Sequence, residues 1–303
     1  MSVSEENFPT FIKSFLQYLE FEKRYSKHTL IAYKDDLANF LSFLDLQYVP
    51  WQIENINHAI IRTWVVELSD NEIGARSITR KLACLRSLFK FLLQRKIVET
   101  NPMLLVKAPK VEKRLPVFIE ENEITLLFNG DFFTDDFQGI RDKLLLELIY
   151  GTGLRLSEII DLKEVDFKLN FNEMNVLGKG NKYRIVPIHH HLQTKLQEYH
   201  KLKKLEFECN STSPFLVTDK GKQLYPMFVY RKVKQYLTLI STQEKKSPHV
   251  LRHTFATHLL NKGADLNAIK DLLGHSSLAA TQVYTHNSME KLKKIFEQAH
   301  PRA

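Results

Sequence analysis

In the first hundred residues, apolar side chains recur every three or four positions, the spacing that places them on one face of a helix. Shorter apolar groups predict a first helix near residues 11–19 and a third near 60–68. The two clearest stripes are Leu30, Tyr33, Leu37, Phe40, Leu41 and Leu44, followed by Ile78, Leu82, Leu85, Phe89 and Leu92. The pattern therefore predicts an all-α N-terminal domain over residues 1–107.

Residues 108–116 interrupt this pattern with two prolines and a run of charges. Because proline blocks helix continuation and dense charge resists burial, this segment is predicted to be a linker. A second domain then covers residues 117–303.

The second domain is again mostly helical. Residues 174–188 are the exception, because they alternate like two strands around a Gly-Lys-Gly-Asn-Lys turn, which predicts a β-hairpin with Lys179 at its tip. The predicted helices are 121–129, 139–151, 155–162, 190–206, 225–240, 249–261, 265–273, 277–285 and 289–298. The expected fold is therefore mainly α with one small β-hairpin.

Composition limits the class of protein. The 303 residues contain only two cysteines, Cys84 and Cys209, too few for a disulfide framework or a cysteine-rich zinc site. No apolar run approaches the roughly 18 residues that cross a bilayer, and no basic-then-apolar signal sequence begins the chain. We therefore expect a cytoplasmic protein.

The net charge of +8 is unevenly distributed along the chain. Residues 118–166 carry a net charge of −8, whereas residues 168–252 carry +10, and residues 76–96 hold seven basic side chains and no acidic one. Such runs are often only solvated faces, but two basic segments around an acidic one favour a surface for nucleic acid. The candidate DNA contacts in the N-terminal domain are Arg76, Arg80, Lys81, Arg86 and Lys90.

Several common sites are excluded or disfavoured. No P-loop motif is present, and the Gly-Thr-Gly segment 151–153 lacks the third glycine of a dinucleotide-binding turn. The run His189–His191 and the set His249, His253 and His258 lack the spacing or the glutamate of a zinc site. We therefore expect neither a cofactor nor a metal ion.

A set of residues suited to phosphate chemistry is spread over the second domain. Each of them is weak evidence alone, since most Arg-Glu pairs and most tyrosines are structural. Two pairs have a helical spacing: Glu158 follows Arg155 by one turn, and Arg252 follows His249 by three residues. The full set is Arg155, Glu158, Lys179, His249, Arg252, His275 and Tyr284.

The motifs around these residues follow one another in a known order, and the chain resembles the tyrosine site-specific recombinases of the phage integrase family, most closely the XerC/XerD chromosome-dimer resolvases. The N-terminal half is similar to the core-binding domain of that family, in the segments 26–37 and 80–92. The blocks that carry the resemblance in the catalytic half are 151–158, 178–187, 249–257, 272–277 and 281–286.

The resemblance implies a role for each matching residue. Tyr284 would attack a DNA phosphate and form a 3′-phosphotyrosyl bond. Arg155 and Arg252 would clamp the phosphate oxygens, whose negative charge grows in the transition state.

The remaining positions are implied to transfer protons, to hydrogen-bond the phosphate or to orient a neighbour. Lys179 would protonate the departing 5′-oxygen, His249 would assist proton transfer at the tyrosine, and His275 would hydrogen-bond the phosphate. Glu158 would orient an active-site side chain. No metal or nucleotide is implied.

The resemblance also implies partners: a double-stranded recombination site, a homo- or heterotetramer with a second Xer-type recombinase on two sites, and a septal DNA translocase. The tail 289–303 would pack on a neighbouring protomer or on its own domain. The implied function is resolution of chromosome dimers at a dif-like site. An integrase of a phage or mobile element and a non-catalytic DNA-binding regulator remain alternatives. The first predicted helix begins near Phe8, leaving no room for the extra N-terminal domain of arm-binding integrases.

Overall fold

The computed structural model describes residues 8–112, 117–168, 170–178 and 183–274. The chain divides into two compact units, residues 1–114 and 115–303, and each has its own hydrophobic core. Residues 106–112, which include the described part of the predicted linker, form no helix or strand. The assignment of 108–116 as an interdomain linker stays a prediction.

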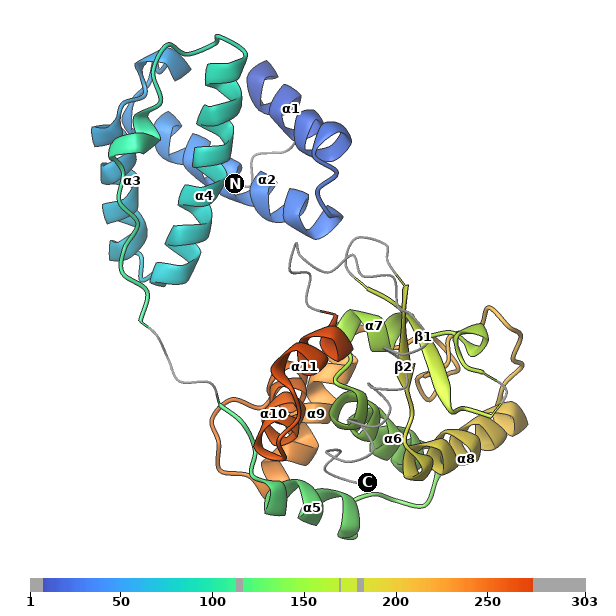
Figure 1. Cartoon of the computed structure of the whole chain (residues 1–303). Helices are drawn as coiled ribbons and strands as arrows, with labels where there is room; N and C mark the ends of the chain where they lie inside the picture. Colours follow the sequence, from blue (N-terminus) through green and yellow to red (C-terminus); the bar gives the residue numbers. More distant parts are fainter. Residues whose placement is uncertain (1–7, 113–116, 169, 179–182, 275–303) are drawn as a thin grey trace. The chain divides into compact units, whose positions relative to one another are not determined.

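The described part of the N-terminal unit is built on four α-helices (Figure 1). Helix α4 packs against each of the other three, and its apolar stripe, from Ile78 to Leu92, is buried. The four helices are α1 (Thr10–Gln17), α2 (Lys27–Gln47), α3 (His58–Asp70) and α4 (Ala75–Gln94). The predicted first helix, 11–19, is α-helical only as far as Gln17, because a π-helical turn, Tyr18–Glu22, follows α1.

Side-chain caps fix where two of these helices begin. Ser26 Oγ accepts from the backbone N–H of Thr29 at the start of α2, and Asn57 Oδ1 accepts from Ala59 and Ile60 at the start of α3. These bonds satisfy backbone donors that have no partner within the helix.

In the described part of the second unit, six α-helices and one hairpin accompany the central helix α6, of whose 16 residues 13 are buried. Helices α7, α8, α9 and α10 all contact α6. The elements are α5 (Glu121–Asn129), α6 (Phe137–Thr152), α7 (Leu156–Asp161), β1 (Glu173–Leu177), β2 (Tyr183–Pro187), α8 (His190–Glu206), α9 (Pro226–Ile240), α10 (Pro248–Asn261) and α11 (Leu266–Leu273).

The predicted mainly α fold with a small sheet is confirmed. Strands β1 and β2 are antiparallel, with Glu173 opposite Pro187 and Leu177 opposite Tyr183. Residues 179–182 at the predicted hairpin tip, and the predicted helices 277–285 and 289–298, lie outside the described residues. Among the described helices, none is both long and apolar enough to cross a membrane.

Candidate active site

Three arginines from three different elements meet around one buried carboxylate in the second unit. Arg155 is the residue that precedes α7, Arg184 lies on β2, and Arg252 lies one turn into α10. The carboxylate belongs to Glu158 in the first turn of α7, which lies beside α11 and β2 (Figure 1).

Both oxygens of Glu158 accept charge-assisted hydrogen bonds. Arg184 donates from Nη1 to Oε1 and from Nη2 to Oε2, each at 2.9 Å. Arg155 donates from Nη1 to Oε1 at 2.7 Å and from its backbone N–H to Oε2 at 2.8 Å. Nη1 of Arg252 is 3.9 Å from Oε2.

These bonds keep Glu158 ionised. Burial is the largest single influence and favours the neutral acid, but the hydrogen bonds and charges of Arg184 and Arg155 outweigh it and lower the pKa of Glu158 to about 2. The carboxylate is therefore charged at neutral pH and anchors the arginines electrostatically.

The same three arginines bind three successive carbonyl groups at the end of α11. Arg184 Nε donates to Leu272 O at 3.2 Å, and Arg252 Nη2 donates to Leu273 O at 2.7 Å. Arg155 Nη2 donates to Gly274 O at 2.7 Å. The last carbonyls of a helix have no partner within it and carry partial negative charge, so they attract guanidinium groups.

Two glycines in the left-handed conformation shape this site. Gly274 ends α11 at φ +63°, and Gly153 ends α6 at φ +62° with its carbonyl accepting from Arg252 Nη1. A Cβ on Gly153 would lie 2.6 Å from Leu273 Cδ2 and 2.7 Å from Phe255 Cδ1, so only glycine fits. The predicted end of helix 265–273 before Gly274 is confirmed, whereas the predicted helix 139–151 continues to Thr152, so that Gly153 directly follows it.

The cluster carries an excess of positive charge, because three guanidinium groups surround one carboxylate. Burial, together with the like charges of Arg155 and Arg184, lowers the pKa of Arg252 to about 10, which still leaves it protonated at neutral pH. The Arg155 side chain is 29% exposed, so the positive charge reaches solvent. Such a site favours a bound anion with several oxygens, such as a phosphate.

His249 lies beside this cluster in sequence and differs from it in exposure. Ser247 caps α10, Pro248 occupies the first helical position, and His249 is exposed on the first turn. Arg252, three residues later, is buried. The role of the exposed His249 imidazole in proton transfer stays a prediction.

The other three residues expected in the site are Lys179, His275 and Tyr284, and all lie outside the described residues. Two of them lie close in sequence to the end of a described element. Lys179 is two residues beyond the end of β1, and His275 follows Gly274 at the end of α11. Their roles stay predictions.

Of the five basic residues expected to contact DNA in the N-terminal unit, three donate hydrogen bonds within that unit. Arg80 and Lys81 donate to the two oxygens of the buried Asp36, at 2.5 and 3.2 Å, and Arg86 donates to Val106 O at 3.1 Å. Arg76 and Lys90 are exposed. Contact with DNA stays a prediction for all five.

Two of the histidines considered for metal binding have other contacts. His189 caps α8 by accepting from His191 N, and His258 Nδ1 is 2.9 Å from Tyr150 Oη. Among the described residues, no three histidine, cysteine, aspartate or glutamate side chains gather in a way that could hold a metal ion.

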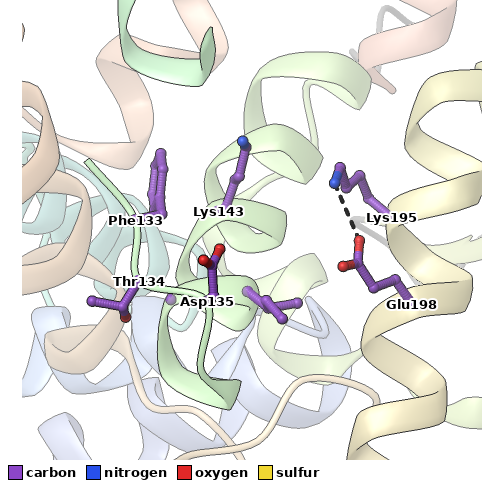
Figure 2. A pocket seen from close by; sticks show the side chains of 8 residues that line it. Phe133, Thr134, Asp135, Lys143, Lys195 and Glu198 are labelled. Atoms are coloured by element: carbon purple, nitrogen blue, oxygen red, sulfur yellow. Dashed lines mark hydrogen bonds and ion pairs between the residues drawn. The ribbon is translucent and has the colours of Figure 1, made fainter. Parts of the chain in front are cut away.

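A pocket elsewhere in the second unit has balanced charge. Lys143 and Lys195 line it together with Asp135 and Glu198, and Lys195 Nζ is 3.1 Å from Glu198 Oε2 (Figure 2). Because its charges compensate one another, this pocket offers no comparable attraction for a phosphate. The arginine cluster is the stronger candidate site.

Sequence reasoning missed one member of the cluster, Arg184. It lies within the 178–187 block, but neighbouring residues gave no reason to select it. Its partners Glu158 and Leu272 are 26 and 88 positions away in sequence, so only the tertiary fold shows the contact.

Comparison with known proteins points to a single family. The Phage integrase family matches residues 118–291, and the Phage integrase N-terminal SAM-like domain matches residues 12–96. The chain is 38% identical to tyrosine recombinase XerC of Chlorobaculum parvum, covering 96% of this chain and 94% of the relative. It is 36% identical to XerC of Bacillus subtilis, covering 98% of each chain, and 35% identical to XerD of Staphylococcus saprophyticus, covering 97% and 99%.

Solved structures share the fold. The XerH site-specific recombinase bound to a palindromic difH substrate aligns with a TM-score of 0.71 at 22% identity, over 97% of this chain and 89% of the other. The Tn1549 transposon integrase in complex with circular intermediate DNA aligns with a TM-score of 0.67 at 17% identity, over 94% and 99%.

Proposed function

The chain belongs to the phage integrase family of tyrosine recombinases, enzymes that cut and rejoin DNA through a tyrosine-linked intermediate, and on that premise we propose that it resolves chromosome dimers at a dif-like site. The observation that carries the proposal is the arginine cluster around Glu158, in a chain whose Xer relatives match it over nearly its full length. Separation of joined chromosomes then precedes cell division.

Arg155 and Arg252 bind the scissile phosphate in this proposal. A guanidinium has five N–H donors, and the contacts of Arg155 with Glu158 and Gly274 use only part of that capacity. Negative charge grows on the non-bridging oxygens as the phosphorane forms. Donors held in place before the reaction stabilise that charge without reorganisation.

Tyr284 is the proposed nucleophile. Its Oη forms a bond to phosphorus, its proton passes toward His249, and the bond to the 5′-oxygen breaks. Lys179 gives a proton to that departing oxygen, and His275 hydrogen-bonds a phosphate oxygen. The products are a 3′-phosphotyrosyl bond and a free 5′-hydroxyl. A 5′-hydroxyl from the partner strand then attacks the phosphotyrosine and restores a phosphodiester.

This reaction exchanges one phosphate ester for another. The energy of the phosphodiester is retained in the phosphotyrosyl bond, so the proposed reaction consumes no nucleotide. The proposed partners are duplex DNA and other recombinase protomers, either identical or of a second Xer type, in a tetramer on two sites. A septal DNA translocase would activate cleavage, and the proposed location is the cytoplasm, where the chromosome lies.

Cleavage is tested with DNA that the protein itself selects. The sequence recovered from a random duplex pool is rebuilt as a nicked suicide substrate, from which the cut strand diffuses away. We expect a covalent adduct that survives denaturation, forms in EDTA and is absent from Tyr284→Phe. No adduct from the wild-type protein would overturn the activity.

The biological role needs a second measurement. The selected sequence is located in the genome, and a plasmid with two copies of it is incubated with the protein and a second Xer-type recombinase. A chromosomal site near the replication terminus and excision between the copies are expected. A site at the ends of a mobile element would identify an integrase instead.

A further inference from the structure

We propose that Arg184 is a positioning residue for the recombination reaction: it holds Glu158 and the end of α11 in place so that Arg155 and Arg252 face the phosphate. The inference rests on the proposed function of this site. No role for Arg184 is implied by its local sequence, and the contacts of its guanidinium supply one.

Arg184 forms the most complete pairing with Glu158 of the three arginines. Both of its Nη atoms donate to the carboxylate, one to each oxygen, at 2.9 Å. Arg155 reaches the carboxylate with one Nη atom, and Arg252 lies 3.9 Å away. Arg184 therefore compensates most of the Glu158 charge, which leaves the positive charges of Arg155 and Arg252 for the phosphate.

Arg184 is placed to act through other residues rather than on DNA. The residue is 7% exposed, as is Arg252, but the two differ in their partners. Both Nη atoms of Arg184 are paired with a carboxylate, whereas those of Arg252 donate to main-chain carbonyls. The Nε of Arg184 donates to Leu272 O while both Nη atoms face Glu158, so the guanidinium is turned toward protein on every edge. A Cβ placed on Gly274 would lie 3.2 Å from Nη1, which shows how tightly the group is packed.

The position of Arg184 on β2 extends its influence to the hairpin. Its neighbour Tyr183 pairs with Leu177 at the last described rung before residues 179–182. Through one side chain, the strand that follows the segment containing Lys179 is bonded to α7 and to α11. Arg184 thus links three elements, each of which lies close in sequence to a proposed catalytic residue: Lys179 precedes β2, Arg155 precedes α7, and His275 follows α11.

The test compares two buried arginines that undergo the same substitution. Arg184→Lys keeps the positive charge but loses the two-pronged pairing with Glu158. Arg141→Lys is the matched control, because Arg141 is also buried and paired with carboxylates, those of Asp142 and Asp219, outside the site. Single-turnover cleavage of the nicked suicide duplex and the melting temperature are measured for both variants.

We expect Arg184→Lys to slow cleavage at least tenfold with unchanged DNA affinity. Arg141→Lys lowers the melting temperature, but its folded protein cleaves at the wild-type rate. Equal cleavage by Arg184→Lys and wild type would overturn the inference, as would an equal loss of cleavage in the two variants. A wild-type protein that forms no adduct would instead overturn the proposed function, and this inference with it.

A double-mutant cycle shows whether Arg184 acts through Glu158. Arg184→Gln should slow cleavage strongly in the wild-type background and much less in a Glu158→Gln background. In the single variant, Glu158 also loses its main stabilising partner, so cleavage should decline at acidic pH where wild-type cleavage does not. Independent effects of the two substitutions, or an unchanged pH profile, would exclude a positioning role.

Discussion

Tyr150 Oη and His258 Nδ1 lie 2.9 Å apart in the interior of the second unit, where α6 packs against α10. Phe118 contacts the His258 ring edge-on, and the N–H of Ile119 donates to Thr254 Oγ1. Phe118 and Ile119, near the start of the second unit, therefore contact α10, the helix that carries Arg252. Burial of the Tyr150–His258 pair favours the neutral imidazole, because a charged one would lose its hydration.

The stability of the protein should fall as the solution is acidified below the ordinary pKa of histidine, about 6.5. Burial is the main influence that lowers the pKa of His258, and Lys262 acts in the same direction, whereas Glu120, Glu121 and a bond to Ile119 oppose it. The unfolded chain therefore binds this proton more readily than the folded one, so the free energy of unfolding decreases with falling pH. Urea unfolding from pH 8 to pH 5 measures this.

His258→Gln is the control for that measurement, because it removes the titrating group. We expect the variant to be less stable at pH 8 but to lose less stability between pH 8 and pH 5. An undiminished loss in His258→Gln would assign the pH dependence to other groups, among them His200, whose pKa burial also lowers.

Gly153→Ala should damage both stability and cleavage. The left-handed backbone alone costs an L-residue about 1–2 kcal/mol, and overpacking against Leu273 and Phe255 adds about 1–3 kcal/mol. Because the Gly153 carbonyl binds Arg252, displacement of the backbone also misplaces that guanidinium. Denaturant unfolding and suicide-substrate cleavage are the measurements.

Gly263→Ala is the control that separates the cost of the left-handed backbone from the cost of overpacking. Gly263 has φ +83°, but nothing lies within 4 Å of a Cβ placed there. This variant should lose only the backbone contribution of about 1–2 kcal/mol and cleave normally when folded. Equal losses in the two variants would show that the contacts of Gly153 have no special importance.

The local features of the site were predictable from sequence, since they depend on neighbours along the chain. The contact of Arg155 with Glu158 follows from their spacing across the first turn of α7, and the glycine at each helix end follows from its conformational freedom. The helices 121–129 and 190–206 match their predicted bounds for the same reason.

Features that depend on distant partners were not predictable. Asp36 binds Arg80 and Lys81 across 44 and 45 positions, so two residues predicted to contact DNA are paired within their own unit. Burial also raises the pKa of Asp36, which no local pattern shows. The pairing of Arg184 with Glu158 has the same origin.

Loss of an exposed basic residue on α4 should weaken DNA binding in a salt-dependent way. Arg76→Gln and Lys90→Gln each remove one expected phosphate contact. The slope of log K against log salt concentration should therefore become shallower by about 1 per substitution. Fluorescence anisotropy with a labelled duplex at several salt concentrations measures the slope.

Arg86→Gln is the matched control on the same helix, since Arg86 donates to Val106 O and is less exposed. It should lower the melting temperature and leave the slope closer to that of the wild type. Slopes for Arg76→Gln and Lys90→Gln equal to the wild-type value would remove these two residues from the expected DNA interface.

The two cysteines should differ sharply in reactivity. Cys84 is buried, and burial raises the pKa of its thiol, whereas Cys209 is partly exposed. Only the thiolate reacts, so an aromatic disulfide reagent should modify one thiol quickly and the second only as the protein unfolds. Cys209→Ser should remove the fast phase, and a fast phase that persists in that variant would contradict the burial of Cys84.

The three bonded carbonyls at the end of α11 also restrict which changes of chain length the protein tolerates. Asp265 caps the start of this helix, and its last carbonyls meet guanidiniums from three separate elements. One inserted residue would turn everything beyond it by about 100° and advance it by about 1.5 Å, so each arginine would face the wrong oxygen. Relatives of this protein should therefore vary in length in the exposed loop 242–245 and keep residues 265–274 free of insertions and deletions.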